Sequence, residues 1–322
     1  MKKFIASFIS ILLLVGCSNS TNTATSTIEP TSIPTIESTE ETVINTDLKI
    51  IAPSGAPALS QLGAILQGYD VEIVDGPDKL QAELINSDSE YDVIVAPTNL
   101  GIKLAANGKS EYKLLEVVTF GNLYLVGPED ADLENCTIAG FGEQAVTGLV
   151  FKSIYPELAD KVNWGYASVS EAQAALLSDE ADVAILAEPV ATATISKAKE
   201  QGKELTILAD LQELWNSGEG YPQAGIFVKE NSYEENTESY DAYITTIERY
   251  IQEVSDNDDT TALAETIDSI GVETLSVPSS AIITKVWDRL NIHPTRASGI
   301  ESEIEEFLKL FDVEEVSNAI IH

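Results

Sequence analysis

One pattern of strands and helices occurs twice in this chain, and it constrains the fold more than any other feature. Each copy begins with a short apolar strand, KIIA at 49–52 and TIA at 137–139. Each copy ends with an apolar strand and a proline, YDVIVAP at 91–97 and ADVAILAEP at 181–189, after an amphipathic helix. Continuous apolar strands that alternate with helices are typical of a parallel sheet covered on both faces. The repeat therefore predicts two similar α/β units.

Polar residues follow the four strands of the repeat, and they are the first candidates for a binding site. In open α/β sheets, ligands bind beyond the carboxyl ends of the strands, where helix N-termini present free N–H groups. Glycines in such loops let the backbone approach a ligand closely. Ser, Thr, Asn and Glu also cap helices, so capping is the alternative interpretation of each residue taken alone. The candidates at the strand ends are Ser54, Gly55, Thr98, Asn99, Gly142, Glu143, Gln144 and Glu188.

The chain is long and strongly acidic. Its 322 residues exceed the usual size of a domain with a single core, which favours two lobes. The formal net charge of −35, from 53 acidic and 18 basic residues, argues against binding to nucleic acid or to an anionic lipid surface. Two explanations of the acidity stay open: adaptation to a salty or alkaline habitat, and solubility alone.

The N-terminus has the features of an export signal. Two lysines precede a short apolar run, which ends at Gly16 and Cys17. This order is typical of a secretory signal peptide, and the run is shorter than the roughly 20 residues of a membrane span. Gly16-Cys17 resembles the bacterial lipobox, in which the cysteine is lipidated; an ordinary signal peptide with an incidental cysteine is the alternative. We expect a signal peptide at 1–16, lipidation of Cys17, and a disordered Ser/Thr-rich tether at 17–46.

The sequence indicates neither catalysis nor metal binding. The two histidines, His293 and His322, belong to no recognisable nucleophile motif, and no G-x-S-x-G or P-loop motif occurs. The acidic run at 256–259 lacks the glycine and the distal glutamate of a calcium loop. If Cys17 is lipidated, Cys136 is the one remaining cysteine, so no intrachain disulfide is expected. We expect no enzyme activity, no cofactor and no metal.

Four segments of the chain carry a family resemblance. They are DVIVAPTNLG at 92–101, FGNLYLVG at 120–127, ADVAILAEP at 181–189 and YPQAGIFV at 221–228. With the lipobox and the tether, they resemble the substrate-binding proteins of ABC transporters. The most similar branch contains the sulfonate/taurine binders and the binders of thiamine pyrimidine precursors. The resemblance extends in order and spacing over roughly 47–322.

The resemblance implies an α/β fold of the periplasmic-binding-protein type II, with a ligand cleft between two lobes. Lobe I would consist of 47–126 plus 226–322, and lobe II of 127–225. The strands at 122–126 and 224–228 would form the hinges. Helices expected to pack on lobe I are those at 239–254, 279–290 and 301–311.

The resemblance also implies a function, partners and further site residues. We expect an extracytoplasmic monomer that delivers a small solute to an ABC permease and its ATPase. The lipid anchor would be its one contact with the membrane, and no nucleic acid is involved. A sensory lipoprotein with the same fold is an alternative, and an enzyme is a third possibility. Further candidate ligand contacts are Gly121, Asn122, Thr147, Tyr221 and Gln223.

The distribution of arginine bears on the charge of the solute. No arginine precedes Arg249, although arginine is the usual partner of carboxylate, sulfonate or phosphate. The candidate loops contain Glu143 and Glu188, near aromatic residues that could stack on a ring or a cation. These are Phe120, Tyr124, Phe141 and Tyr221. We therefore favour a neutral or cationic, heteroaromatic solute. A sulfonate such as taurine is the alternative, because helix N-termini, Arg289 or Arg296 could hold an anion.

Overall fold

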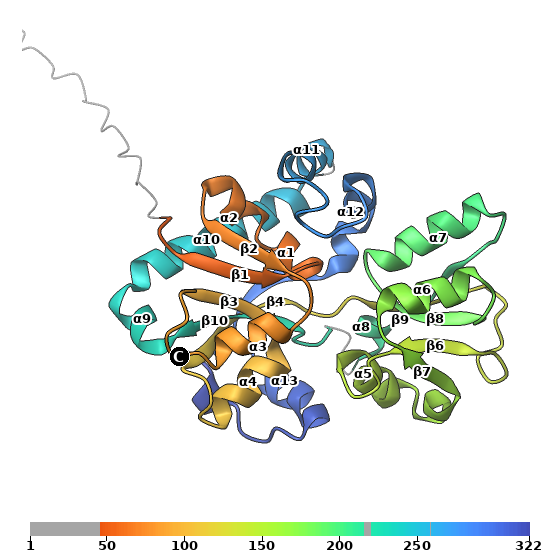
Figure 1. Ribbon diagram of the computed structural model, residues 1–322, viewed down its shortest axis with the longest axis horizontal. Coiled ribbons are helices and arrows are strands. Elements are labelled where there is room, and N and C mark those ends of the chain that lie inside the picture. The colour runs from red at the N-terminus through yellow and green to blue at the C-terminus, as the bar shows by residue number, and fades with distance from the viewer. Residues whose placement is uncertain (1–45, 216–219, 258) are drawn as a thin grey trace, which may run out of the picture. The chain divides into compact units, whose positions relative to one another are not determined.

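The repeat predicted from the sequence is present in the fold. The computed structural model describes residues 46–215, 220–257 and 259–322, which contain two β-sheets flanked by helices (Figure 1). The parallel strands of the first sheet are β1 (Lys49–Pro53), β2 (Asp70–Val74) and β3 (Val93–Pro97). Those of the second sheet are β6 (Ile138–Phe141), β7 (Val162–Tyr166) and β8 (Val183–Ala187). In both copies the first strand lies between the other two, so the copies have the same topology.

An aspartate fixes the start of each copy in the same way. Asp92 accepts a hydrogen bond from the Lys49 backbone N–H at 2.8 Å and donates its own N–H to the Lys49 carbonyl at 2.9 Å. Asp182 and Thr137 make the same two bonds, at 2.8 and 3.0 Å. Each pair satisfies backbone groups at the beginning of two neighbouring parallel strands. The repeated Asp-Val of the sequence therefore has a structural role.

Antiparallel strands extend each sheet. In the first sheet, β10 (Ala224–Lys229) lies between β3 and β4 (Tyr112–Thr119), and β11 (Ile292–Arg296) pairs with the other edge of β4. In the second sheet, β5 (Leu123–Gly127) lies between β8 and β9 (Thr206–Asp210). The strands of the repeat are therefore parallel, as predicted, and the added antiparallel strands make both sheets mixed.

Helices cover both faces of the first sheet. The helices associated with it are α1 (Ala56–Leu59), α2 (Leu62–Gln67), α3 (Asp78–Leu84), α4 (Thr98–Ala106), α9 (Glu230–Glu235), α10 (Thr237–Ser255), α11 (Thr261–Ile270), α12 (Ser280–Val286) and α13 (Glu301–Leu308). Successive strand residues point to opposite faces. Ile50 and Val93 accordingly pack with α2 and α10, whereas Ile51 and Ile94 pack with α3, α4 and α13 (Figure 1).

The second sheet is covered in the same manner. Its helices are α5 (Val146–Ile154), α6 (Val169–Leu177), α7 (Val190–Glu200) and α8 (Leu211–Leu214), with a 3-10 turn, η1 (Pro156–Lys161). Val126 and Ala184 pack with α6 and α7, while Leu125 and Ile185 pack with α5 and α8. The alternation of apolar residues along each strand therefore explains the two helical layers on either side of both sheets.

The chain passes between the sheets at two places. The first passage is 120–122, between β4 and β5, and the second ends with 221–223, just before β10. Among the described residues, β5 pairs with strands of the second sheet and β10 with strands of the first sheet. The passages therefore lie immediately before β5 and β10, which are the strands expected at 122–126 and 224–228.

The two sheets share part of their core. One buried cluster includes Ile51 of the first sheet, Ile185 of the second, and Phe120 and Tyr221 of the passages. The described residues belong to one compact unit. The expected C-terminal helices are present as α10, as α12 followed by η2 (Trp287–Leu290), and as α13 followed by η4 (Lys309–Phe311).

The predicted export signal, Cys17 and nearly all of the tether lie outside the described residues. In the part of the chain that the structure describes, no helix is both long enough and apolar enough to cross a membrane.

Candidate functional site

Polar residues of three segments meet where β3 and β4 end and β10 begins. Thr98, the first residue of α4, donates its backbone N–H to the Gln223 carbonyl at 3.0 Å. Gln223 in turn donates its backbone N–H to the Thr119 carbonyl at 2.9 Å. These bonds place Thr98, Gln223 and Thr119 side by side, and Asn99 follows Thr98 in α4. We refer to Thr98, Asn99, Thr119 and Gln223 as the polar row.

The polar row contains buried oxygens that have no hydrogen-bond partner among the described residues. They are Thr98 Oγ1, Asn99 Oδ1, Thr119 Oγ1 and Gln223 Oε1. Leaving a buried polar group without a partner costs about 1–3 kcal/mol, and native proteins rarely do so. The capping interpretation is not supported for Thr98 and Asn99, since these side-chain oxygens bind no backbone N–H. A polar molecule bound beside the row would satisfy these atoms.

Asn122, in the first passage, has a side-chain amide whose orientation is fixed by a hydrogen bond. Its Nδ2 donates to the Glu188 carbonyl at 2.9 Å, and the Glu188 N–H donates to the Asn122 carbonyl at 2.8 Å. The first of these bonds requires a donor, so it fixes which end of the amide is the oxygen. Asn122 Oδ1 is buried and has no partner in the described part of the chain. This atom therefore presents a hydrogen-bond acceptor that only a donor can satisfy.

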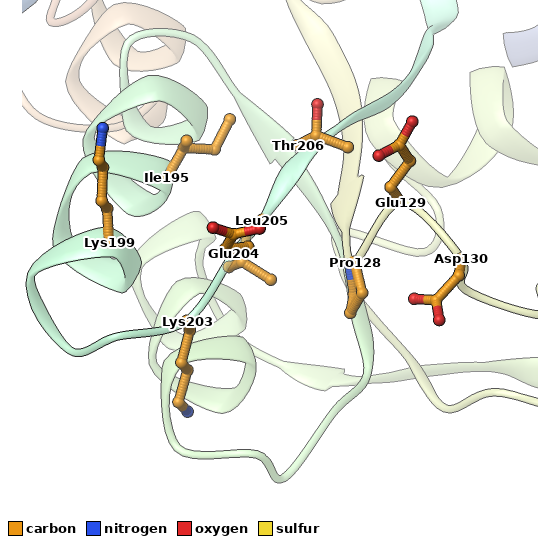
Figure 2. A pocket seen from close by; sticks show the side chains of 9 residues that line it. All are labelled: Pro128, Glu129, Asp130, Ile195, Lys199, Lys203, Glu204, Leu205 and Thr206. Carbon is orange, nitrogen blue, oxygen red and sulfur yellow. The ribbon is translucent and has the colours of Figure 1, made fainter.

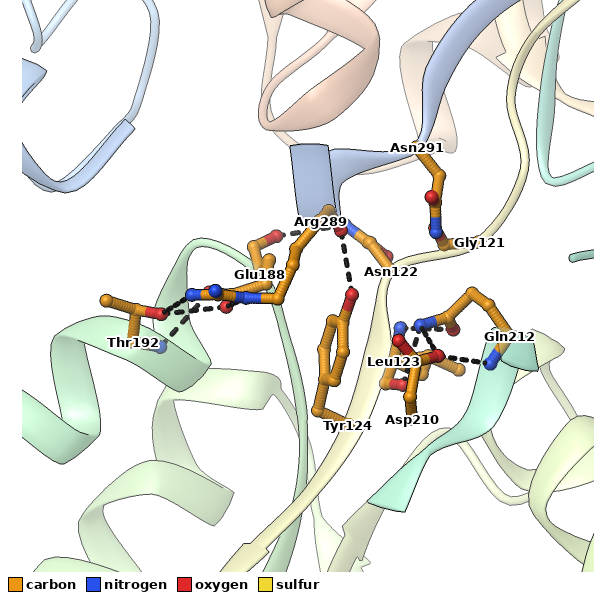
Figure 3. Close-up of polar contacts among 10 residues, drawn as sticks. All are labelled: Gly121, Asn122, Leu123, Tyr124, Glu188, Thr192, Asp210, Gln212, Arg289 and Asn291. Carbon is orange, nitrogen blue, oxygen red and sulfur yellow. Dashed lines mark hydrogen bonds and ion pairs between the residues drawn. The ribbon is translucent and has the colours of Figure 1, made fainter. Parts of the chain in front are cut away.

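Glu188 is buried, and it lies at the centre of a contact between the second sheet and η2 near the C-terminal end of the chain (Figure 3). Its carboxylate accepts hydrogen bonds from the Thr192 hydroxyl at 2.7 Å and the Thr192 N–H at 3.0 Å. Arg289 of η2 forms an ion pair with it, with Nε 2.9 Å from Oε1. Arg289 Nη2 also donates to the Thr192 hydroxyl at 2.7 Å. Both carboxylate oxygens are thus already bound within the chain.

This ion pair changes the electrostatics expected from the sequence. The negative charge of Glu188 was one reason to favour a cationic solute, but Arg289 compensates that charge directly. Glu143, the other acidic candidate, is exposed and pairs with Lys152 at 2.8 Å. Neither glutamate therefore offers an uncompensated negative charge to a solute. Arg289, which we considered from the sequence as a partner for an anion, is occupied by Glu188 and Thr192.

Tyr221 lies in the core rather than on an open surface. Its ring is fully buried, stacked on Phe307 at a centroid distance of 5.4 Å, with Trp215 edge-on at 5.9 Å. Burial raises the pKa of the Tyr221 hydroxyl well above its ordinary value. The hydroxyl donates to Gln212 Oε1 at 3.2 Å. Tyr221 therefore has a packing role, and its ring is not available for stacking on a solute in this arrangement.

Gly121 is required for the same packing. Its φ of +90° belongs to the left-handed region that favours glycine, and a Cβ there would lie 2.6 Å from the Tyr221 ring. The Gly121 carbonyl accepts a hydrogen bond from Asn291 Nδ2 at 2.9 Å. Gly121 thus allows the first passage to pass closely between Tyr221 and the C-terminal segment.

The other predicted residues lie on two loops at strand ends. Ser54 and Gly55 follow β1 and are half-buried, and Gly55 has a φ of +85° just before α1. In the second sheet Gly142 follows β6 with a φ of +63°, Gln144 is exposed, and Thr147 is buried on α5. These positions are at the carboxyl ends of their strands, as expected. Among the described residues, no hydrogen bond or ion pair joins these positions to the polar row.

Cavities also occur away from the predicted residues. One of about 640 Å³ lies at the far end of the second sheet, where β5 ends and β9 begins (Figure 2). Its polar lining combines two lysines, Lys199 and Lys203, with the acidic Glu129, Asp130 and Glu204. Lys203 is paired with Asp179 at 2.7 Å. With charges of both signs and no predicted site residue, this cavity does not identify a ligand.

Sequence reasoning missed several residues of the site. Thr119 ends a strand, as the predicted polar residues do, but it lies outside the repeat and was overlooked for that reason. Thr192 lies in the first turn of α7, and its backbone N–H is bound by the Glu188 side chain that precedes the helix, which is the capping interpretation given for Glu188. Gln212 accepts the Leu123 N–H at 2.6 Å and donates to the Leu123 carbonyl at 3.0 Å, and no local sequence signal predicts this.

Comparison with known proteins supports the fold. Neither a protein-family model nor a curated protein matches the sequence. Among solved structures, an ABC transporter protein from Parabacteroides distasonis is similar over 86% of this chain and 99% of its own, with 20% identity and a TM-score of 0.70. The periplasmic aliphatic sulphonate binding protein SsuA from Escherichia coli is similar over 86% and 92%, with 13% identity and a TM-score of 0.63.

A third similar structure is the ligand binding component of an ABC-type import system from Staphylococcus aureus, with zinc bound. It covers 86% of this chain and 97% of its own, with 14% identity and a TM-score of 0.61. At these identities the likeness concerns the fold. The chain thus has the two-lobed α/β fold of periplasmic binding proteins, and the predicted fold class is confirmed.

Proposed function

We propose that this protein is the extracytoplasmic solute-binding component of an ABC importer. The observation that carries the proposal is the set of unpartnered buried oxygens in the polar row and on Asn122. These atoms lie beside both passages between the sheets, where a solute would contact both halves of the chain. Proteins of the same fold are described as an ABC transporter protein and as a binding component of an ABC-type import system. Binding rather than catalysis is therefore the proposed role.

Solute capture would require movement of two lobes. The lobes expected from the sequence are 47–126 plus 226–322 for lobe I and 127–225 for lobe II. Because β5 pairs with β8 and β9 of lobe II, we propose to count β5 with lobe II, so that the first boundary falls at the passage 120–122. A solute that contacts both lobes stabilises the closed arrangement by the difference in its affinity for the two arrangements.

The hydrogen-bonding character of the site favours a solute that carries N–H donors. Asn122 Oδ1 needs a donor, and the hydroxyls of Thr98 and Thr119 can act as donor or acceptor. Arg289 is already paired with Glu188 and so is not free to bind an anionic group of a solute. A neutral or cationic solute, such as an amino-substituted heteroaromatic compound, fits this set. The aromatic candidates do not add support, since Phe120, Tyr124 and Tyr221 are buried and Phe141 is half-buried.

A sulfonate is the second candidate. The Escherichia coli protein of similar fold is an aliphatic sulphonate binding protein. Glu188 contacts both Arg289, through its carboxylate, and Asn122, through its backbone carbonyl. To bind an anion, Arg289 would have to give up its ion pair with Glu188. A sensory role without transport would use the same solute site, and a permease and an ATPase encoded next to the gene would distinguish transport from sensing.

The remaining parts of the proposal concern location. Export by the signal peptide at 1–16, lipidation of Cys17 and the tether at 17–46 would hold the binding unit outside the cytoplasm at the cell membrane. We propose a monomer that acts with a permease and its ATPase.

Calorimetry with a chemically chosen panel tests the proposed function. The panel comprises aminopyrimidines, taurine, short alkanesulfonates and, as a matched negative, pyrimidines without amino groups. We expect tight one-to-one binding of a donor-bearing compound. Tight binding of sulfonates alone would favour the second candidate, and no binding across a wider small-molecule screen would count against a solute-binding function.

A further inference from the structure

We propose that Glu188, Arg289 and Thr192 form a latch that holds the two sheets together before any solute is bound. The inference rests on the proposed solute-binding function for its consequence, but its geometry is independent of a solute. Glu188 follows β8 of the second sheet, and Arg289 lies in η2, directly before β11 of the first sheet. Their ion pair is therefore a contact between two halves that the chain joins elsewhere by the passages at 120–122 and 221–223.

The latch is held rigidly on the side of the second sheet. Glu188 is buried, and Thr192 donates to it from both its hydroxyl and its backbone N–H. Asn122 holds the Glu188 backbone through two hydrogen bonds: its side-chain Nδ2 donates to the Glu188 carbonyl, and its backbone carbonyl accepts the Glu188 N–H. A carboxylate fixed in this way presents one orientation to its partner, so a single arginine position satisfies it.

The latch is held equally well on the side of Arg289. The Arg289 carbonyl accepts a hydrogen bond from the buried Tyr124 hydroxyl at 3.0 Å (Figure 3). Two residues further on, Asn291 donates from Nδ2 to the Gly121 carbonyl at 2.9 Å and accepts the Phe120 N–H at 3.0 Å. The segment 289–291 is thus bound along the first passage, and movement of the two sheets about this passage has to displace it.

The partners of the ion pair differ in exposure, and this makes the latch reversible. The Glu188 side chain is completely buried, whereas 38% of the Arg289 side chain is exposed. Salt screens an exposed charge more effectively than a buried one. When Arg289 leaves, water can solvate it, while Glu188 retains the Thr192 bonds. The latch therefore stabilises one arrangement without preventing the other.

Asn122 connects the latch to the proposed solute site. Its Nδ2 holds the Glu188 carbonyl, and its Oδ1 is the unpartnered acceptor. A donor bound to Oδ1 would polarise the same amide and strengthen its bond to Glu188. Solute binding would then tighten the latch rather than replace it.

Distance measurements on the solute-free protein test this proposal without reference to any solute. Spin labels are placed at Gln81 and Ala174, which are exposed on the equivalent helices α3 and α6. The full-length chain carries Cys17→Ser and Cys136→Ser, so that only the introduced cysteines react. Double electron–electron resonance then gives the distribution of distances between the labels at positions 81 and 174.

Three variants are compared in this background. Arg289→Gln removes the ion pair, and Thr192→Val removes the bridging hydroxyl with little change of shape. Arg296→Gln is the matched control, because Arg296 pairs with Glu116 and Asp241, which are both associated with the first sheet. We expect a broader and longer distance distribution for Arg289→Gln, a smaller change for Thr192→Val, and none for Arg296→Gln. Raising salt should broaden the wild-type distribution but not that of Arg289→Gln.

An unchanged distribution for Arg289→Gln would overturn the latch, as would an equal change for Arg296→Gln. Should Arg289→Gln fail to fold, Thr192→Val decides by the same criteria. Neither result depends on whether a solute is ever found, so the latch and the proposed function can fail separately.

Discussion

Asn122 donates a 2.9 Å hydrogen bond from its side-chain amide to the carbonyl of Glu188, although the two residues belong to different segments of the chain. The bond fixes the orientation of the amide and leaves Asn122 Oδ1 buried without a partner in the described part of the chain. One side chain thus holds the chain at the first passage and faces the proposed site.

We predict that Asn122→Leu lowers both stability and affinity. Leucine removes the donor that binds the Glu188 carbonyl, and the loss of such a buried bond costs about 1–3 kcal/mol. It also removes the acceptor Oδ1, so affinity for the identified solute should fall by about fivefold to a hundredfold. Denaturant titration and calorimetry measure the two effects. Asn107→Leu is the control, because Asn107 makes a similar bond to the Lys103 carbonyl on an exposed surface. Equal effects in both variants would contradict the role of Asn122.

Gly121→Ala should destabilise the protein much more than Gly202→Ala. Both glycines have positive φ, +90° and +77°, so both variants carry the backbone strain of a left-handed residue. At Gly121 the new Cβ would also lie 2.6 Å from Tyr221 and 2.8 Å from Gln212, whereas nothing lies within 4 Å at Gly202. We expect a loss of about 1 kcal/mol at Gly202 and at least about 2 kcal/mol more at Gly121. Similar melting temperatures would show that the passage adapts easily.

Glu116 makes the stability of the first sheet dependent on pH. The residue is buried on β4, and burial raises the pKa of its carboxyl from the ordinary 4.5 to about 7, with Glu248 contributing and Arg296 opposing. Arg296 Nε lies 3.4 Å from one carboxyl oxygen, and the other oxygen has no partner among the described residues. Between these pH values the folded protein keeps a proton that the unfolded chain has released. The free energy of unfolding therefore falls as pH rises from about 4.5 to about 7, and it stays low above that interval.

Glu116→Gln isolates this contribution. The variant should lose up to about 3 kcal/mol of the pH dependence between pH 4.5 and 7, measured by denaturant titration at several pH values. Glu111→Gln, an exposed position just before the same strand, serves as the control and should leave the wild-type profile intact. A Glu116→Gln profile parallel to that of the wild type would mean that Glu116 stays charged in the folded protein.

Cys17→Ala tests the proposed anchor in cells. A diacyl anchor needs the thiol, so the variant should be soluble or remain uncleaved, whereas the wild type fractionates with membranes. Mature-length Cys17→Ala protein in the membrane fraction would exclude the lipobox interpretation. Cys136→Ser is the control for loss of a cysteine. Cys136 is half-buried against the core, and its substitution should not change fractionation.

Much of the fold could be predicted from the sequence because the repeat is local. Asp92 and Asp182 stand at the same place in two motifs, and the structure gives them the same bonds. The antiparallel strands β5 and β10 could not be placed in this way. Each pairs with strands that are distant in sequence, and apolar composition alone does not identify such partners. The placement of the hinges at these two strands therefore stays a prediction.

The candidate site was predicted less completely, and for a physical reason. Thr98 and Asn99 could be proposed because strand ends have a recognisable pattern. The partner of Glu188 could not, since Arg289 is 101 residues away along the chain and no local signal links the two. Aromatic residues near the passages looked available for stacking, but Tyr221 is buried against Phe307 from the C-terminal segment. Burial by a distant segment is a property of the tertiary structure, not of the local sequence.

The central claim is that the unpartnered oxygens of the polar row exist to bind a solute, and Thr98→Val tests it most directly. Thr98 is completely buried, and its hydroxyl has no partner among the described residues, so valine keeps the shape and removes the unsatisfied group. Thermal unfolding is measured for the wild type and the variant, with and without the solute identified by calorimetry. We predict that Thr98→Val is as stable as the wild type or more stable without solute, and that its solute-induced rise in melting temperature is much smaller. A variant that is less stable alone but keeps the full solute-induced rise would contradict the account.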